Sequence, residues 1–387
     1  MKTMKWKFYS LAFVAGMSIL TACSSDDNND NDGNGGNGNG NEIENGTILK
    51  GTITSDVTLA AGNTYKLSGE YIVEEGATLH IEEGVKIIAV YDDIADYILV
   101  KQGGKINAVG TPDKPIVMTS EKEEPGAWGG IHICGRAHTN AEGGKGSSEI
   151  GGAVYGGNDD ADNSGTLQYI RLEYTGFAFD EEHEANGISF YGVGNGTIVD
   201  HCQAYKGSDD GFEFFGGSVN GSNLVAVSCS DDSFDWTEGW NGKGTNLVAY
   251  QEAESTLGYD CDCLMECDNN GSNNAATPVA HPVLKNLILV GNGGSKQGIR
   301  LRAGTEVEID NAKVCGKGQP LTVETALTEN ALKNGTSKLT NITLTSELSS
   351  KEGIYTHADF IAVTSNKVDA NLSYSSFEDI RKECSWM

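Results

Sequence analysis

Short apolar stretches recur along the chain, and glycine, asparagine or aspartate separates them. The stretch VTLAAGNTYKLSGEYIVEEGATLHIEEGVKIIAV, which starts at Val57, alternates apolar and polar residues within each of its segments. Alternation with a period of two predicts β-strands that bury one face, and the intervening Gly, Asn and Asp predict turns. With 51 Gly, 6 Pro and 38% hydrophobic residues, the composition also favours many strands and turns over long helices.

The strands follow a repeat. DDGFEF at 209–214 is echoed by DDSFDW at 231–236, an offset of 22 residues. Similar strand phrases begin at Thr166, Thr197, Asn223, Asn246 and Val283. A repeat of this length is typical of one coil of a β-solenoid, whereas a propeller blade needs about 40 residues and a jelly roll has no repeat.

The segment GATLHIEEGVKI at 76–87 resembles the opening coils of right-handed parallel β-helices. We therefore predict an all-β fold, a right-handed parallel β-helix that spans residues 46–387. Both ends of a solenoid need caps. The first cap is expected near Gly46 to Gly69, and the last near Glu347 to Met387, where the repeat fades.

Aligning ISFYG at 188, FEFFG at 212, FDWTE at 234, MECDN at 265 and IRLRA at 299 predicts which side chains face inward. Parallel strands lie about 4.8 Å apart, so aligned residues form ladders along the solenoid. The expected core stacks are Ile188, Phe212, Phe234, Met265 and Ile299, and beside them Phe190, Phe214, Trp236, Cys267 and Leu301. The residues between these stacks, Ser189, Glu213, Asp235, Glu266 and Arg300, are predicted to point outward along one line.

This outward line lies next to two acidic turns, Asp209-Asp210 and Asp231-Asp232. Two carboxylates about 5 Å apart repel by roughly 3 kcal/mol at an effective dielectric of 20. Such a cluster is expected to take up protons, to pair with bases such as Arg300 and Lys206, or to bind a cation. Several carboxylates and turn carbonyls together suit Ca²⁺, which makes these four aspartates the candidate metal ligands.

Two other interpretations stay open for the same residues. Aspartate favours turns because it bonds local backbone, and outward acids are then simply solvated. Alternatively, Asp209, Asp210, Asp231 and Asp232 act as acid and base of a carbohydrate-active enzyme, with Arg300 or Lys206 holding a uronate. The segment GSDDG at 207–211 resembles part of the polygalacturonase pattern, but the Gly-His-Gly and Arg-Ile-Lys segments of that pattern are missing.

A glycan-binding face is a further possibility. Phe215, Trp240 and Tyr259 lie near the acidic turns and are expected to expose rings on which sugars stack. Together with Glu213, Asp235 and Glu266 on the outward line, they are the candidate ligand-binding residues.

The N-terminus predicts export. Three lysines precede the short apolar stretch LAFVAGMSIL, and Leu20-Thr21-Ala22-Cys23 resembles the lipobox of bacterial lipoproteins. This resemblance implies a signal peptide at 1–22 and diacylglycerol on Cys23. Residues 23–45 are rich in Gly, Asn and Asp, which predicts a flexible tether. Ser24-Ser25-Asp26-Asp27 is similar to the acidic signal that sends Bacteroidota lipoproteins to the outer face of the outer membrane.

The net charge and the cysteines give weaker indications of function. A net charge of −28 argues against nucleic acid as a partner and suits cations, neutral glycans or basic proteins. An exported location permits disulfides among the eight cysteines that follow Cys23. Their pairing is not readable from spacing, and Cys261, Cys263 and Cys267 lack the paired spacing of a zinc site. Disulfides, free buried thiols and a metal thiolate site all stay open.

The segments GAWGGIHICGRA at 126–137, YGGNDDADNSGTLQYIRLEYTG at 155–176 and the region 209–240 resemble a family of β-helical lipoproteins and secreted proteins common in Bacteroidota. This resemblance implies fold and location but no reaction. We predict an outer-membrane lipoprotein, facing the exterior, that binds an extended glycan or a surface protein, with Ca²⁺ as a candidate ligand and without enzymatic activity. A polysaccharide lyase or glycoside hydrolase is the alternative, and a structural spacer or adhesin is the third.

Overall fold

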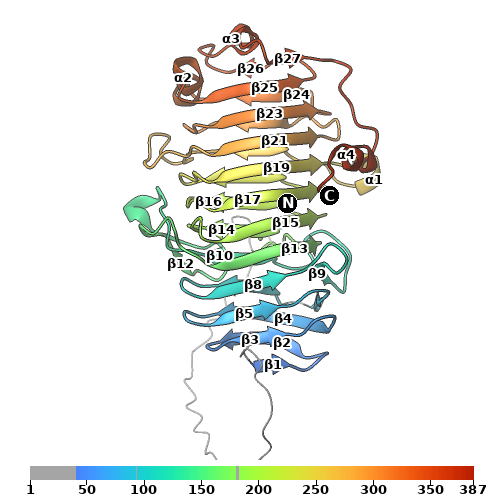
Figure 1. The fold of residues 1–387 in the computed structure, drawn as a ribbon. Helices are drawn as coiled ribbons and strands as arrows, with labels where there is room; N and C mark the ends of the chain where they lie inside the picture. The colour runs from blue at the N-terminus through green and yellow to red at the C-terminus, as the bar shows by residue number, and fades with distance from the viewer. Residues whose placement is uncertain (1–40, 93, 180–182) are drawn as a thin grey trace, which may run out of the picture. The chain divides into compact units, whose positions relative to one another are not determined.

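The computed structural model describes residues 41–92, 94–179 and 183–387, and Cys23 with the predicted signal and acidic motif lies outside these residues. The described chain winds into stacked coils of parallel strands (Figure 1), which confirms the predicted right-handed parallel β-helix. The first strand, β1, begins at Asn41, ahead of the predicted start at Gly46. None of the helices in this part of the chain has the length and apolarity needed to cross a membrane.

Three parallel sheets run along the solenoid. The first coils contain β1 (Asn41–Ile43), β2 (Ile48–Ile53), β3 (Val57–Leu59), β4 (Thr64–Val73), β5 (Thr78–Ile81), β6 (Lys86–Ala89), β7 (Tyr97–Val100), β8 (Lys105–Val109) and β9 (Ile116–Ser120). Later coils each contain one long strand, and these are β13 (Gly165–Glu173), β15 (Ile198–Tyr205), β17 (Asn220–Val227), β19 (Lys243–Tyr250), β21 (Val283–Val290), β23 (Glu308–Cys315) and β25 (Lys338–Leu344). The N-terminal halves of these long strands continue the first sheet from β8, and their C-terminal halves continue the second sheet from β9.

The third sheet continues from β7 through β10 (Ile131–Cys134), β14 (Ile188–Tyr191), β16 (Phe212–Phe215), β18 (Phe234–Thr237), β20 (Met265–Cys267), β22 (Gln297–Leu301), β24 (Gln319–Val323) and β26 (Ser349–Ser350). Its register pairs Ser189 with Glu213, Glu213 with Asp235, Asp235 with Glu266 and Glu266 with Arg300. The predicted alignment is therefore confirmed residue by residue.

The inward side chains form the predicted stacks. All ten predicted core residues are at most 4% exposed. The rings of Phe190 and Phe214 lie 5.0 Å apart, and those of Phe212 and Phe234 lie 5.5 Å apart, each pair within 12° of parallel. Burying a side chain of this size stabilises the fold by roughly 1.5–3 kcal/mol, so the stacks are a main source of stability.

A ladder of asparagines turns the long strands from β17 onward from the first sheet to the second. Asn223, Asn246, Asn286 and Asn311 all have positive φ, between 56° and 61°, at the bend. The amides of Asn246, Asn286 and Asn311 each donate to the oxygen of the asparagine in the preceding coil, at 2.8 Å, 3.0 Å and 2.9 Å respectively. Asparagine adopts left-handed backbone more readily than other residues with side chains, which explains why the repeat places it there.

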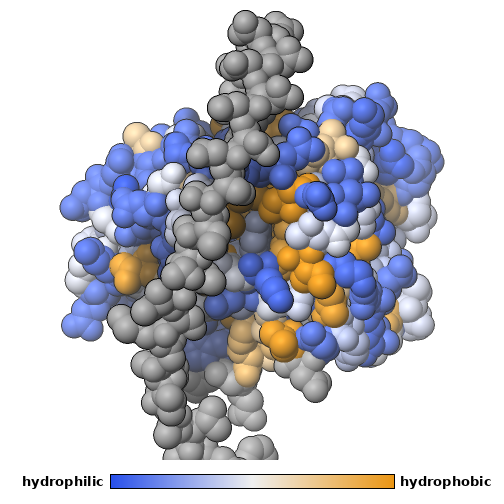
Figure 2. Space-filling model, turned by 90° about the horizontal axis from the view of Figure 1, so that it is seen from below, coloured by the Kyte–Doolittle hydropathy of each residue, from blue (hydrophilic) through white to orange (hydrophobic). Residues whose placement is uncertain are grey.

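The two ends of the solenoid differ from the predicted caps. Gly46 to Gly69 belongs to ordinary coil strands, β2, β3 and the start of β4. On the coloured part of Figure 2, hydrophobic residues gather at the end of the solenoid near β1, and hydrophilic residues surround them. Ile43 and Ile53 pack there, partly buried, against the core.

The C-terminal end is closed by α2 (Ala326–Asn334), α3 (His357–Ala362) and β27 (Lys367–Val368). Residues 372–387, which include α4 (Phe377–Glu383) and which we call the C-terminal strap, instead return along the side of the solenoid (Figure 1). Ile380 and Cys384 of the strap pack on Val225, Val248 and Val290 of the second sheet. Only the first part of the predicted cap therefore covers the end.

The remaining short elements are β11 (Gly146–Ser147) and β12 (Val154–Tyr155), which pair antiparallel in a long loop, the 3-10 turn Glu142–Gly144, and α1 (Glu254–Leu257). The loop with β11 and β12 brings Glu149 to the third sheet, where its carboxylate accepts a bond of 3.2 Å from the Tyr191 hydroxyl.

Candidate functional site

Ten acidic residues line one cleft on the outer side of the third sheet. They are Glu149, Glu184, Asp209, Asp210, Glu213, Asp231, Asp232, Asp235, Asp262 and Glu266, and with Asn186 and Arg300 they form what we call the acidic cleft, of about 410 Å³. All four predicted aspartates, the outward acids Glu213, Asp235 and Glu266, and Arg300 meet in this cleft. The sequence therefore predicted its centre.

A second ladder fixes the turns that lead into the strands. The Asp210 amide donates to Asn186 Oδ1 at 3.2 Å, the Asp232 amide donates to Asp210 Oδ1 at 2.8 Å, and the Cys263 amide donates to Asp232 Oδ1 at 2.6 Å. One oxygen of Asp210 and one of Asp232 thus bond local backbone, as expected for turn aspartates. Asp210 and Asp232 are themselves only 5% exposed, whereas the outward acids Glu213, Asp235 and Glu266 are half-buried.

Within the described chain, the lysine and arginine side chains that pair with acids of the cleft are Arg300, Arg302 and Lys296. Arg300 bonds Glu266 at 2.8 Å and Glu324 at 3.3 Å, Arg302 bonds Glu266 at 3.2 Å, and Lys296 pairs with Asp262. Lys206, the other candidate base, pairs with Glu252 at 3.0 Å and does not line the cleft. In the ion pairs of the described chain, the six acids on the β16 and β18 coils, Asp209, Asp210, Glu213, Asp231, Asp232 and Asp235, have no cationic partner.

Burial and mutual repulsion raise the pKa values of these acids. Burial, followed by repulsion from Asp231, raises the pKa of Asp209 to about 8. Burial and the carboxylate of Asp262 raise the pKa of Asp231 to about 6. The pKa values of Asp210, Glu213, Asp232 and Asp235 are also well above their usual range, mainly because of burial.

The oxygens are spaced as a hard cation requires. One oxygen each from Asp209, Asp210 and Asp231 lie within 4.8 Å of one another, and the same holds for Asp210, Glu213 and Asp235. Ca²⁺ binds oxygens at 2.3–2.6 Å, so ligands on opposite sides of one ion lie up to about 5 Å apart. Asp235 Oδ1 is buried and has no hydrogen-bond partner in the described chain, so this oxygen is available to coordinate a cation. The residues present therefore fit calcium.

Two of the predicted sugar-stacking rings belong to the interior. Trp240 is 2% exposed, lies 4.2 Å from the Phe214 ring and donates from Nε1 to Val219 O at 3.1 Å. Phe215 is 7% exposed and stacks on Tyr191 at 4.4 Å. Their expected exposure is wrong, because the chain bends inward after β18 and because a long loop covers the outer side of β16.

Tyr259, the third candidate ring, is partly buried and its hydroxyl donates to Ser228 O at 2.8 Å. It does not line the acidic cleft.

All eight cysteines of the described chain are buried free thiols. Burial raises the pKa of Cys261 to about 12 and that of Cys267 further, so these thiols stay protonated. Of the predicted cluster, Cys263 alone approaches carboxylates, those of Asp232 and Asp262. The cysteines of the described chain therefore form no disulfide, and one thiol beside two carboxylates differs from the ligand set of a structural zinc site.

Sequence reasoning missed Asp262, Asn186, Glu149 and Glu184. Two of these were within reach, because extending the confirmed register aligns Asp262-Cys263 with Asp231-Asp232, and Asn186 with Asp210. Glu149 and Glu184 come from loops outside the repeat, so no periodic signal marks them.

Comparison with protein families bears on the same residues. The model of the pectate-lyase-like beta helix domain family matches residues 51–385. The chain belongs to this family. Comparison with curated proteins and with solved structures gives no match. Membership of the pectate-lyase-like family agrees with the solenoid and is compatible with glycan binding or with a carbohydrate-active enzyme, and the fold alone does not choose between them.

Proposed function

We propose that the acidic cleft binds Ca²⁺ and, through it, an extended anionic glycan. The observation that carries this proposal is the group of carboxylates on consecutive coils that make no ion pair with another described residue, with the buried Asp235 Oδ1 unbonded among them. Carboxylates this close repel one another by several kcal/mol, and a divalent cation relieves that repulsion.

A glycan follows from the coordination that the protein leaves open. Calcium takes six to eight oxygen ligands, and each group of three carboxylates supplies only part of such a shell. Hydroxyl and carboxylate oxygens of a sugar chain supply the rest. The cleft lies along several stacked coils, so its length suits an extended chain.

Calcium binding is tested by titration calorimetry and thermal unfolding of the folded domain in EGTA and in Ca²⁺. We expect Ca²⁺ to raise the unfolding temperature and the double variant Asp210→Asn, Glu213→Gln to lose this effect. Asparagine at 210 keeps an oxygen for the Asp232 amide, so the turn ladder survives. Asp310→Asn, a surface carboxylate away from the cleft, is the matched control. If Ca²⁺ does not change the unfolding temperature of the unmodified chain, the proposal is contradicted.

Glycan binding is tested on an array of acidic and neutral polysaccharides in Ca²⁺ and in EGTA. We expect acidic chains to bind in Ca²⁺ only and Glu213→Gln to weaken them. If the protein binds Ca²⁺ but retains no glycan, the role of the cleft is limited to binding an ion that stabilises the fold.

One observation favours a second candidate, a polysaccharide lyase or glycoside hydrolase. Asp209 and Asp231 have pKa values near 8 and 6, and two carboxyl groups whose pKa values are separated around neutrality suit the roles of acid and base. Against catalysis, Arg300 is held by Glu266 and Glu324. Release of reducing ends or unsaturated products from a polysaccharide panel, lost in Asp209→Asn, would establish the enzyme.

The location belongs to the same proposal. Lipidation of Cys23 would hold the solenoid at the outer membrane, facing the exterior, as the lipobox resemblance implies. We expect labelled fatty acid to be incorporated into the intact chain, to be lost in Cys23→Ser, and the domain to be removed from whole cells by added protease. Protection from protease on intact cells would place it on the periplasmic side.

A further inference from the structure

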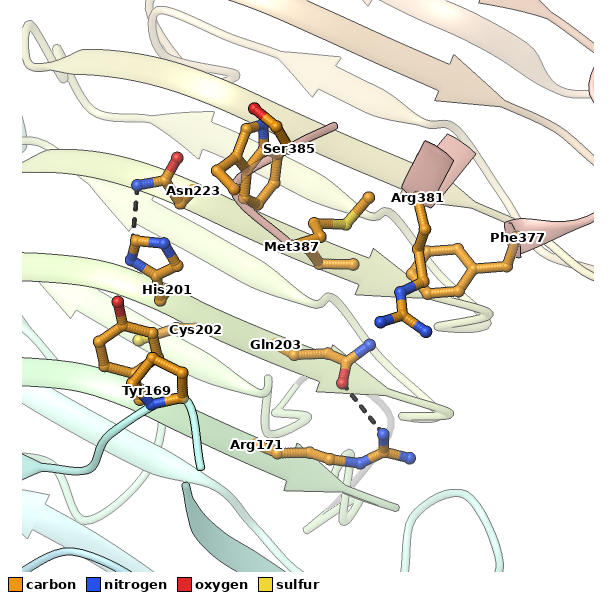
Figure 3. A pocket seen from close by; sticks show the side chains of 13 residues that line it. Tyr169, Arg171, His201, Cys202, Gln203, Asn223, Phe377, Arg381, Ser385 and Met387 are labelled. Atoms are coloured by element: carbon orange, nitrogen blue, oxygen red, sulfur yellow. Dashed lines mark hydrogen bonds between the residues drawn. The ribbon is translucent and has the colours of Figure 1, made fainter. Parts of the chain in front are cut away.

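A second cavity differs from the acidic cleft in the residues that line it. It has a volume of about 650 Å³ and lies between the outer side of the second sheet and the C-terminal strap (Figure 3). Ligand pockets commonly have volumes of 300–1,000 Å³. None of its lining side chains is acidic, although the chain has 55 acidic and 27 basic residues. We call it the strap pocket.

Two strands supply the wall of the strap pocket in register. β13 provides Tyr169 and Arg171, and β15 provides His201 and Gln203, with Arg171 paired to Gln203 in the sheet. Figure 3 shows these side chains projecting from adjacent strands, with Arg381 of α4 opposite Gln203. The rings of Tyr169 and His201 stack at 4.4 Å and 21°. The ring of Trp386 in the strap meets His201 at 6.3 Å, nearly perpendicular.

At this pocket, Tyr169 and His201 replace asparagine in the two coils that precede the asparagine ladder. Both occupy the bend position that holds Asn223, Asn246 and Asn286 in the following coils, and both have a φ of 51°. Left-handed backbone is tolerated by asparagine and is an outlier for a residue as bulky as tyrosine. The exchange also removes the amide bonds that join the later coils. Strained residues of this kind gather at ligand sites, where side-chain chemistry outweighs local stability.

Arg171, Arg381 and Gln203 keep donors available for a ligand, whereas the Asn223 amide already donates to Asp200 at 2.7 Å and its oxygen accepts from Asn246 at 2.8 Å. Arg171 Nε bonds Glu173 and its Nη1 donates to Gln203 Oε1 at 3.1 Å, whereas its Nη2 has no hydrogen bond within the described chain. Arg381 is 52% exposed and makes one long contact of 3.4 Å with Glu378. Guanidinium groups bind carboxylates in a bidentate way, and a side-chain amide such as that of Gln203 donates to hydroxyl groups.

From this arrangement we infer that the strap pocket binds an acidic sugar residue, a pyranose ring that carries a carboxylate. The carboxylate bonds Arg171 and Arg381, the Gln203 amide donates to a ring hydroxyl, and the apolar side of the ring rests against Tyr169, His201 and Trp386. The site lies on a different sheet from the acidic cleft and needs no calcium, so it stands independently of the proposed function.

Calorimetric titration of the folded domain in EGTA with glucuronate, and with glucose as its neutral counterpart, tests the inference. We expect glucuronate to bind at least tenfold more tightly than glucose, because charge-assisted bonds to guanidinium are the strongest in the pocket. Arg381→Gln is expected to weaken glucuronate about tenfold, whereas Lys338→Gln, which removes an ion-paired cation on the first sheet, leaves it unchanged.

The double variant Tyr169→Asn, His201→Asn separates binding from folding. It extends the asparagine ladder by two coils, so we expect an equal or higher unfolding temperature together with loss of glucuronate binding. A structural role for the two rings predicts the reverse, a lower unfolding temperature with binding retained. If this variant does not fold, Arg381→Gln decides the question. Absence of glucuronate binding in the unmodified chain, or equal affinity for glucose, overturns the inference.

Discussion

Replacing Asp209 by asparagine is predicted to stabilise the calcium-free protein at neutral pH. Asp209 is 9% exposed, and its pKa rises in the folded state from 3.8 to about 8 because of burial and the nearby Asp231. A raised carboxyl pKa means that the folded state resists ionisation. The resulting penalty is absent below pH 3.8, grows as the pH rises towards 8 and is constant above it.

The magnitude follows from that window. At pH 7 the gap from 3.8 corresponds to about 4 kcal/mol, at 1.36 kcal/mol for each pH unit. Unfolding entropy of about 2.1 cal/mol/K per residue, over roughly 340 ordered residues, converts this into an increase of about 6 °C in the unfolding temperature. Asp209→Asn is therefore expected to unfold about 6 °C higher than the unmodified chain at pH 7 in EGTA.

Scanning calorimetry from pH 4 to pH 8 in EGTA checks this prediction. The gain should shrink towards zero near pH 4, and Ca²⁺ should stabilise the unmodified chain more than the variant. Asp310→Asn provides a control of opposite sign, because bonds from Asn341 and Thr340 lower the pKa of Asp310. If the difference in unfolding temperature between Asp209→Asn and the unmodified chain did not vary with pH, the reasoning would be refuted, because the penalty would then not arise from ionisation.

Three further outcomes are expected. Trp240→Ala should destabilise the fold by about 3–5 kcal/mol in urea titration, because Trp240 is buried against Phe214, and an exposed sugar platform would cost far less. Asn246→Ala should cost about 1–2 kcal/mol in the same assay, because it breaks two bonds of the ladder and leaves alanine with positive φ. Asn330→Ala, on the exposed face of α2, removes only one bond within the helix and should change little. The eight thiols should react with a thiol reagent only on unfolding, and fast labelling of the native domain would contradict their burial.

The sequence predicted those parts of the molecule that its repeat governs. The echo of DDGFEF in DDSFDW set the pairing of Glu213 with Asp235, and the same register carried through to Glu266 and Arg300 although the intervening loops differ in length. This succeeds because a parallel strand shifted by one residue would turn every core side chain outward.

The parts outside the repeat were not accessible in this way. The exposure of Phe215 was misjudged because the loop that buries it contributes only two very short strands and has no period. Trp240 follows a bend at Glu238, where φ is 53°, and alternation along β18 says nothing about a ring beyond such a bend. The path of the C-terminal strap depends on a few apolar contacts, such as Ile380 on Val248, that local pattern does not reveal.

The solenoid explains how one chain supports an acidic cleft and a strap pocket of contrary character. Inward positions are fixed by the core stacks, whereas outward positions on each sheet vary without disturbing the others. Because stability is approximately a sum over coils and their neighbours, a local penalty such as that of Asp209 or Tyr169 is carried by the surrounding coils. The asparagine ladder and the stacks Phe190–Phe214 and Phe212–Phe234 supply that support in the same coils. Repulsive carboxylates and a strained tyrosine are therefore compatible with a stable fold. In the acidic cleft and in the strap pocket these side chains line a cavity, which favours binding roles for both.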